Sequence, residues 1–419
     1  KVSILIPVKN SGDPLKRLLA SLREQEIGAE VEILIADSGS TDGSIETAKA
    51  AGARVLTVRP EDFSHGGTRN LLGREASGEL LIFIVDDVLP SGKGWLAAMA
   101  SALEANPAVA ALSSRQITTP QADLYSRIYL PQVYKDMEFH GDIRYGLSDP
   151  ALLDAIDNND RRRLGYLDTV SMIVRKEVFD QFGFAELKNA EDIELGQRLI
   201  RSGAELGFMH SAPVYHWHER EPAYFMKRTY LGVETFSEHL KKTPTNLQAM
   251  DIKDYEGLRD RVLSLYAIVN LSSRIWLRDK KLLAAGIEGY LRAFGNAVET
   301  LGSRGFAADK NGLRNPSLDA MFAALFPDVN FAKPAQINTL SNHLFVNFSN
   351  HLKLIIAFLL NEGIQPEQRP DEFVAALYRT AATIIGECLG EWALIIREQN
   401  GKCSVEQLDR LMEQGVCYT

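Results

Sequence analysis

The apolar residues in the first half of the chain fall into short, continuous runs. The clearest run, residues 80–85, has six apolar side chains and stops at Asp86 and Asp87. A run without alternation is typical of a strand that is covered on both faces, as in a parallel sheet between two layers of helices. Ligands bind at the carboxyl ends of the strands in such sheets, so we expect the two aspartates to lie at a binding edge.

Strands and helices alternate around this run. Predicted strands are residues 2–8, 31–36, 54–58, 80–85, 108–112, 168–175 and 213–216, the last preceded by an extended stretch at 205–209. Predicted helices are residues 13–22, 45–51, 68–76, 92–106, 176–182 and 191–202. This order predicts an α/β fold with a doubly wound, mostly parallel sheet and right-handed crossovers.

The pattern changes twice along the chain. Residues 118–164 are rich in Tyr, Pro and charge with poor periodicity, which is typical of a variable insertion or of a segment that faces a substrate. Beyond about Tyr224 the strand signals vanish and helical spacing continues to the end, with breaks at 311–316 and 363–370. We therefore predict two domains, an α/β domain at 1–223 and an all-α C-terminal domain at 224–419.

Composition narrows the choice of function and location. The chain has 46 basic and 55 acidic residues, and this net charge of -9 argues against a nucleic-acid partner. Cys388, Cys403 and Cys417 show neither disulfide nor zinc spacing, which favours reduced thiols in the cytoplasm. No apolar run reaches the roughly 18 residues of a membrane span, and residues 352–360, interrupted by Lys353, predict a core helix.

Two histidines and two aspartates are candidates for a metal site. His216 and His218 alternate, so both imidazoles face the same side of an extended segment. Asp87 together with one of them would make a mixed oxygen and nitrogen site suited to Mn²⁺ or Mg²⁺. The alternatives are an ordinary turn at Asp86 and Asp87 and a surface pair of histidines.

Three loops carry further candidate residues. Asp37 follows a strand and is expected to contact a ligand, whereas Asp42 is expected to cap the next helix. Arg69 lies at a predicted helix start after two glycines, a pattern suited to a diphosphate but also to a simple Gly-Gly turn. Glu191 and Asp192 open a helix, where they either favour the helix dipole or provide a general base.

Six stretches in one order resemble a family-2 glycosyltransferase of the GT-A fold. They lie between residues 1 and 220 and read SILIPVKN, IADSGSTDGS, FSHGGTRN, FIVDDVLP, NAEDIELGQRLIRSG and APVYHWHE. The third stretch looks like bacterial rhamnosyltransferases of surface-polysaccharide assembly. The helical second half lies outside the resemblance.

The resemblance implies roles for individual residues. Asp87 corresponds to the last acid of the family's D-x-D metal motif, whose first acid is replaced here by Val85. His216 or His218 would complete the site for Mn or Mg. Asp192 would be the base of an inverting transfer that needs no covalent intermediate. The residues expected around the nucleotide-sugar donor are Pro7, Asn10, Asp37, Arg69 and Asp86.

The implied activity is metal-assisted transfer of a hexose to a glycan or lipid-linked acceptor in bacterial polysaccharide synthesis. The donor would be dTDP-rhamnose or a UDP-sugar, and the location the cytoplasm or the inner face of the cell membrane. The helical half would support the catalytic domain, form an oligomer or bind a partner transferase. Four basic residues lie near the start of this half: Lys227, Arg228, Lys241 and Lys242. They would form either a solvated helix face or a contact with the membrane.

Two other functions remain open from sequence. One is a GT-A domain that binds nucleotide or glycan without catalysis and acts as a scaffold, which Val85 in place of an acid favours. The other is a nucleotidyltransferase, which shares the sheet. That function leaves the E-D stretch at Glu191 and the H-W-H stretch at His216 without a role.

Overall fold

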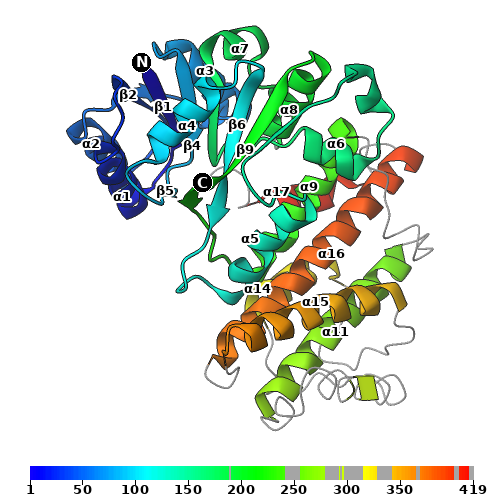
Figure 1. The fold of residues 1–419 in the computed structure, drawn as a ribbon. Helices are drawn as coiled ribbons and strands as arrows, with labels where there is room; N and C mark the ends of the chain where they lie inside the picture. The colour runs from blue at the N-terminus through cyan, green and yellow to red at the C-terminus, as the bar shows by residue number, and fades with distance from the viewer. Residues whose placement is uncertain are drawn as a thin grey trace.

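The computed structural model describes most of the chain (Figure 1). An α/β half with a central sheet is followed by a half built from helices, which confirms the predicted fold class. The described residues are 1–187, 190–240, 255–278, 292, 295–296, 315–327, 342–364, 369–400 and 405–414. Cys403, Cys417, Lys241 and Lys242 therefore lie outside them.

The sheet has nine strands: β1 (Val2–Val8), β2 (Val31–Asp37), β3 (Arg54–Thr57), β4 (Leu80–Ile84), β5 (Leu89–Pro90), β6 (Val109–Ile117), β7 (Ile143–Tyr145), β8 (Ser171–Arg175) and β9 (Glu205–Tyr215). Their order is β3-β2-β1-β4-β8-β6-β9-β5, and β7 pairs with β9. The longest pairings, β1 with β2 and β6 with β9, are parallel. Strand β8 runs antiparallel between β4 and β6, so the sheet is mixed and mostly parallel.

Helices cover both faces of the sheet, as the continuous apolar runs predict. One face packs against α1 (Gly12–Arg23), α2 (Ser44–Ala50) and α4 (Trp95–Glu104). The other face packs against α3 (His65–Glu75), α6 (Asn158–Leu164), α7 (Lys176–Phe182) and α8 (Glu191–Arg201). In β4, Ile82 and Ile84 point to the first layer and Phe83 to the second, and all three are fully buried.

Helix α3 begins three residues earlier than predicted. The Ser64 hydroxyl accepts a hydrogen bond from the Gly67 amide at 3.1 Å, which caps the helix. A Cβ atom on Gly66 would lie 2.1 Å from the Ala185 carbonyl oxygen. The alternative of a simple Gly-Gly turn was wrong, because both glycines lie in the first turn of α3. The absence of a side chain at Gly66 allows the chain at Ala185 to pack on the helix.

The predicted variable segment, 118–164, is folded. It contains α5 (Leu124–Asp136), β7, the 3-10 helix η2 (Pro150–Asp154) and α6. Leu124 and Ile128 of α5 are buried in the apolar core of the helical half. The segment therefore joins the two halves of the chain.

The helical half contains α9 (Pro222–Leu240), α11 (Tyr255–Arg278), α14 (Pro316–Leu325), α15 (Asn342–Asn361), α16 (Pro370–Asn400) and α17 (Glu406–Glu413). Helix α16 crosses the half diagonally and packs along α9 and α5 (Figure 1). The core helix expected at 352–360 is part of α15, where Leu352, Ile355 and Leu359 are buried. The Asn315 side chain caps α14, and Gly363 has a φ of 64° at the end of α15, as the predicted breaks require.

One described helix, Pro370–Arg397, has the length and apolarity of a membrane span. Most of its apolar window, 72%, is buried inside the protein. A core helix meets the same criteria, and the buried residues Phe373, Leu377 and Ile385 place this one in the core of the helical half.

Candidate functional site

A cavity of about 230 Å³ opens at the carboxyl ends of β1 and β4. Its wall also includes residues from α3, the segment before β8, the start of α8, the end of β9 and the start of α9. A larger, more open depression of about 950 Å³ lies beside β7 and α6 and is lined by none of the predicted site residues. The smaller cavity is the candidate site, since six of the predicted side chains that carry charge or bind metal line it: Arg69, Asp86, Asp87, Asp192, His216 and His218.

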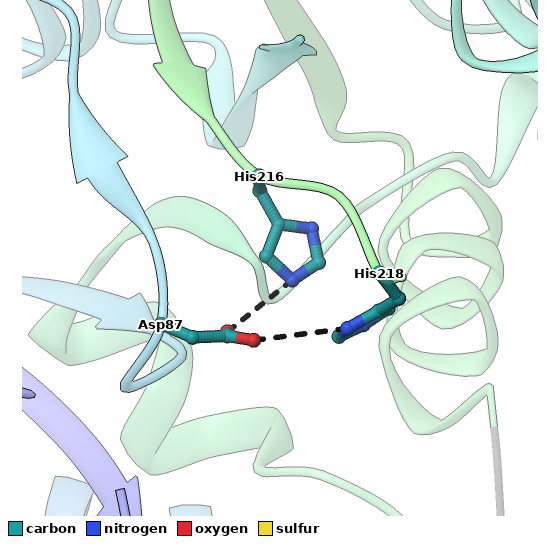
Figure 2. A group of neighbouring side chains, drawn as sticks. All are labelled: Asp87, His216 and His218. Atoms are coloured by element: carbon teal, nitrogen blue, oxygen red, sulfur yellow. Dashed lines mark ion pairs between the residues drawn. The ribbon is translucent and has the colours of Figure 1, made fainter. Parts of the chain in front are cut away.

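Asp87, His216 and His218 converge in this cavity (Figure 2). The His216 Nε2 atom lies 3.3 Å from Asp87 Oδ1, and the His218 Nδ1 atom lies 3.7 Å from Asp87 Oδ2. One carboxylate oxygen and one nitrogen of each ring lie within 4.8 Å of one another. Strand β9 ends at Tyr215, so both histidines follow the strand and reach the loop after β4.

This group fits a divalent cation. Ligand atoms held at roughly 2.1 Å from one ion lie about 3 to 4 Å apart, close to the separations seen here. One carboxylate with two imidazoles matches the ligand preferences of Mn²⁺ and related ions. Burial raises the pKa of Asp87, but the hydrogen bond with His216 holds it at about 2, so Asp87 is a carboxylate at neutral pH. Burial also lowers the pKa of His218 to about 3, which leaves that ring neutral and able to bind metal.

Asp192 lies in the first turn of α8 and faces the same cavity. Its Oδ2 atom accepts hydrogen bonds from the Thr169 amide at 3.1 Å and from the Thr169 hydroxyl at 3.3 Å. Burial raises the pKa of Asp192 to about 7, with further contributions from the charges of Glu191 and Asp168. A carboxyl group with a pKa in this range can both accept and release a proton near neutral pH.

The helix that carries Asp192 starts from an unusual backbone conformation. Ala190, the N-cap residue of α8, has a φ of 58° in the left-handed region, which is uncommon for a residue with a side chain. Residues held in this way are often found at functional sites. Here the left-handed residue comes directly before Glu191 and Asp192 and turns the chain into the helix.

Pro7 and Asp86, for which the resemblance implies a donor-binding role, line the cavity. Burial and the charge of Asp87 raise the pKa of Asp86 to about 6. The two neighbouring aspartates therefore differ, since Asp87 stays ionised to low pH and Asp86 gains a proton in weak acid.

Arg69 is less available to a ligand than its position in the sequence suggests. Only 3% of it is exposed, and its Nη1 atom lies 2.7 Å from Glu191 Oε1 in a buried ion pair. Its Nε atom has no hydrogen-bond partner within the described part of the chain. The charge of Arg69 is thus largely compensated by Glu191, although the side chain still lines the cavity.

Asp37 and Asn10 lie beside the cavity and hold the loop after β2. Asp37 is buried, and its Oδ2 atom accepts hydrogen bonds from the amides of Gly39 and Ser40 at 3.0 and 3.2 Å. Asn10 accepts one from the Thr41 amide at 2.8 Å. Neither is among the cavity-lining residues, whereas their neighbour Ser38 is.

The cavity contains an acid that the sequence pattern did not single out. Asp168 precedes β8, and β8 runs antiparallel to β4 with Ser171 opposite Ile84. The start of β8 therefore lies at the same edge as the end of β4. An acid that precedes a strand lies at this edge only if the strand runs antiparallel to its neighbours. The sequence does not show the direction of β8, so Asp168 was missed.

The helical half also contributes to the cavity. Arg220, Tyr224 and Arg228 line it, and the Arg228 Nη1 atom donates to the Tyr224 hydroxyl at 3.3 Å. The Arg220 guanidinium lies over the Tyr224 ring at 5.8 Å. Further along the wall, burial and the charge of Arg69 lower the pKa of His65 to about 4. Arg220 and Arg228 thus give the side of the cavity near the start of α9 a positive charge.

The fold and this cavity define an α/β protein with a cavity lined by charged residues at the carboxyl edge of its sheet, the edge where ligands bind in such sheets. Residues 3–180 match the family described as Glycosyl transferase family 2. This N-terminal part of the chain is therefore similar to the family-2 glycosyltransferases, which confirms the resemblance predicted from the six motifs.

Named relatives include enzymes of polysaccharide synthesis. The O-antigen chain rhamnosyltransferase RfbN of Salmonella typhimurium is 25% identical over 231 residues, which span 53% of this chain and 68% of the relative. WbaN of Salmonella anatum, described in the same words, is 25% identical over 54% of this chain and 70% of its own. The predicted resemblance to rhamnosyltransferases is therefore confirmed.

Solved structures resemble the chain more distantly. The mannosyltransferase PcManGT from Pyrobaculum calidifontis, in complex with GDP-Man and Mn²⁺, aligns with a TM-score of 0.47 and 16% identity over 93% of this chain and 87% of its own. TarS 1–349 of S. aureus, in complex with UDP-GlcNAc, aligns with a TM-score of 0.42 and 18% identity over 74% of this chain and 93% of its own.

Proposed function

We propose that the protein is an inverting glycosyltransferase that moves a sugar from a nucleotide-diphosphate donor to a glycan or lipid-linked acceptor in bacterial polysaccharide synthesis. The observation that carries this proposal is one cavity that holds both a candidate metal group, at Asp87, and a carboxyl group with a pKa near neutrality, at Asp192. The names of the relatives favour rhamnose as the sugar. The proposed location is the cytoplasm, at the inner face of the membrane where the acceptor is lipid-linked.

Asp192 is the proposed general base. Its carboxylate takes the proton of an acceptor hydroxyl while the hydroxyl oxygen forms a bond to the anomeric carbon of the donor. The bond from that carbon to the diphosphate oxygen breaks, and its electron pair leaves with the nucleoside diphosphate. Thr169 orients the carboxylate through two hydrogen bonds to Oδ2.

The remaining predicted residues bind the donor. Asp87, His216 and His218 would hold Mn²⁺ or Mg²⁺, which when bound neutralises charge on a diphosphate. Asp86 is proposed to contact the ribose or the sugar, and Pro7 to lie against the nucleotide. Asn10 and Asp37 are proposed to act from the adjoining loop, and Arg69 from the cavity wall.

Thermal denaturation with a panel of nucleotide sugars tests this proposal. We expect dTDP-rhamnose or a UDP-sugar to raise the melting temperature, and Mn²⁺ to enlarge the shift, because ligands that bind the native state stabilise it. Asp87→Asn should abolish the Mn²⁺-dependent part, whereas the exposed control Asp62→Asn should retain it. If no nucleotide sugar changes the melting temperature with or without Mn²⁺, the proposal that the cavity binds a nucleotide-sugar donor is wrong.

A non-catalytic scaffold is the second candidate. The observation that favours it is Val85, which stands where an acid would complete the metal motif and which packs against the apolar core. Nucleotide binding that ignores Mn²⁺, together with no release of nucleoside diphosphate from any donor in the panel, would support the scaffold and refute the transferase.

A further inference from the structure

Gln116 connects the candidate metal group to Asp168. It lies one residue before the end of β6, and its side-chain amide reaches both sides. The Nε2 atom donates a hydrogen bond to Asp168 Oδ2, and the Oε1 atom lies 2.7 Å from His216 Nδ1. Asp87, His216, Gln116 and Asp168 therefore form a continuous chain of polar contacts, which begins and ends at residues that line the cavity.

The chemistry of these groups fixes the direction of each hydrogen bond. The other contacts of the Asp168 side chain are also donors, the Tyr166 hydroxyl at 3.1 Å and the Val170 amide at 3.0 Å. With these two donors directed at its oxygens, the Asp168 carboxyl group acts as an acceptor, and the amide nitrogen of Gln116 is the group that faces it. The Gln116 oxygen then faces His216 and can only accept, which requires a proton on His216 Nδ1.

We propose that Gln116 is a positioning residue that keeps the proton of His216 on Nδ1 and thereby makes Nε2 the nitrogen available to a metal ion. The Nε2 atom is the one that faces Asp87 Oδ1, at 3.3 Å. Partners of this kind set the tautomer and ring orientation of metal-binding histidines. The inference rests on the metal role of His216 in the proposed function.

An irregularity in strand pairing brings Gln116 to His216. Ser114 of β6 pairs with Met209 of β9, but Gln116 pairs with Val214, so two steps along β6 correspond to five along β9. The three extra residues, at roughly 3.3 Å each in a regular strand, correspond to a shift of about 10 Å. Asp142 stabilises the irregular part, since its Oδ1 atom accepts from the amides of His210 and Ser211 at 2.6 and 2.8 Å.

In an uninterrupted register Gln116 would lie opposite Ser211 and far from the histidines. With the observed register, Ile117 pairs with Tyr215, and the His216 amide donates to the Ile117 carbonyl at 3.1 Å. The unequal register of β6 and β9 thus places Gln116 beside His216. Bulges that re-aim a side chain in this way are common next to active sites.

Binding of Mn²⁺ alone to the full chain, measured by titration calorimetry, tests the proposal. Gln116→Met keeps the size of the side chain and removes both hydrogen bonds. We expect it to weaken Mn²⁺ binding about 10- to 100-fold, the usual effect of losing a partner of a metal-binding histidine. Gln132→Met on the exposed face of α5 is the matched control and should bind Mn²⁺ as the wild type does.

A paired substitution separates positioning from a general loss of structure. In Gln116→Glu with Asp168→Asn, the amide and the carboxylate exchange places: the new amide at position 168 donates, and the new carboxylate at position 116 still accepts from His216 Nδ1. The net charge is unchanged. We expect Mn²⁺ binding within about threefold of wild type, and a double variant as weak as Gln116→Met would overturn the proposal.

NMR of the metal-free protein labelled with ¹⁵N-histidine gives a readout independent of metal binding. We expect a proton on His216 Nδ1 in the wild type and in the double variant, with the signal assigned by its loss in His216→Gln. An Nδ1 atom without a proton would overturn the proposal, as would wild-type Mn²⁺ affinity in Gln116→Met. A wild-type protein that binds no Mn²⁺ would refute the metal role in the proposed function, while the proton position would still decide the role of Gln116.

Discussion

Asp192 carries a carboxyl group whose surroundings oppose its ionisation. Burial, Glu191 and Asp168 raise its pKa to about 7, while the hydrogen bonds from Thr169 act in the opposite direction. A general base acts only when deprotonated, so the proposed role of Asp192 would make the fraction of active enzyme depend on pH near neutrality.

The pKa of Asp192 predicts how the rate of sugar transfer depends on pH. Below about pH 7 we expect the transfer rate to fall about tenfold for each pH unit, because the protonated Asp192 cannot accept the acceptor's proton. Asp192→Asn should lower the rate constant by about 10²- to 10⁴-fold and leave nucleotide binding unchanged. Steady-state kinetics from pH 5 to 9 check both, and wild-type turnover by Asp192→Asn would exclude it as the base.

The buried pair of Arg69 and Glu191 predicts a large effect on stability. Glu191→Ala leaves the guanidinium buried without a carboxylate partner, and the free energy of unfolding should fall by about 3 to 5 kcal/mol. Glu75→Ala, at the exposed pair with Arg54, is the control and should cost less than about 1 kcal/mol.

Urea denaturation of the two single variants and of Arg69→Met with Glu191→Leu measures these effects. We expect the double variant to recover much of the loss, because it leaves no uncompensated charge in the interior. Equal losses in Glu191→Ala and Glu75→Ala would mean that the pair at α3 and α8 is not buried in solution.

At the scale of elements, α16 packs closely along α9. A Cβ atom on Gly386 would lie 2.1 Å from the Met226 carbonyl oxygen, and one on Gly390 would lie 2.8 Å from the Val233 Cβ atom. Glycine costs about 1 kcal/mol relative to alanine within a helix. The two glycines therefore contribute through packing, because only a hydrogen atom fits between the helices at these positions.

This contact predicts the sign of a substitution that usually stabilises helices. Gly386→Ala should lower the free energy of unfolding by about 1 to 3 kcal/mol, since overpacking outweighs the gain in helix propensity. Gly92→Ala, where a Cβ atom would meet nothing within 4 Å, is the control and should be nearly neutral. Thermal denaturation of both variants decides the point, and a stabilised Gly386→Ala would show that α9 and α16 lie further apart.

The elements could be predicted where the signal is local. The run before Asp86 and the acids at Glu191 each combine a local hydrophobic pattern with a polar stop, and the structure has the strand β4 and the helix α8 at these places. The direction of β8, and with it the position of Asp168, depends on which strands pair and has no local signal. The same holds for Gln116, whose position requires the unequal register of β6 and β9.

At the scale of the whole molecule, α5 joins the two halves. Its N-cap residue Asp123 accepts a hydrogen bond from the Ser126 amide at 3.1 Å and forms an ion pair with Arg379 of α16. The Tyr129 hydroxyl lies 3.0 Å from both His351 Nδ1 and the Thr380 hydroxyl. The packing therefore crosses the proposed division of the chain near residue 223.

Asp123→Ala tests this connection. The loss of a helix cap costs about 1 kcal/mol, and a partly buried Arg379 without its carboxylate should add to that loss. Asp149→Ala, which removes a cap from the 3-10 helix η2, is the control for capping alone. Chemical denaturation should show the larger destabilisation for Asp123→Ala, and equal effects would mean that the contact with α16 contributes nothing.

The position of α5 has a consequence for how such chains can recombine. The chain leaves the sheet after β6, places α5 in the core of the helical half and returns to the sheet at β7 and then β8. A single crossover near residue 223 would combine the α5 of one parent with the α9 and α16 of another, whose surfaces did not evolve together. A folded hybrid needs both α5 and the chain from the start of α9 onward to come from the same parent. A new helical half would therefore be inherited together with the segment between β6 and β8, which contains Asp168.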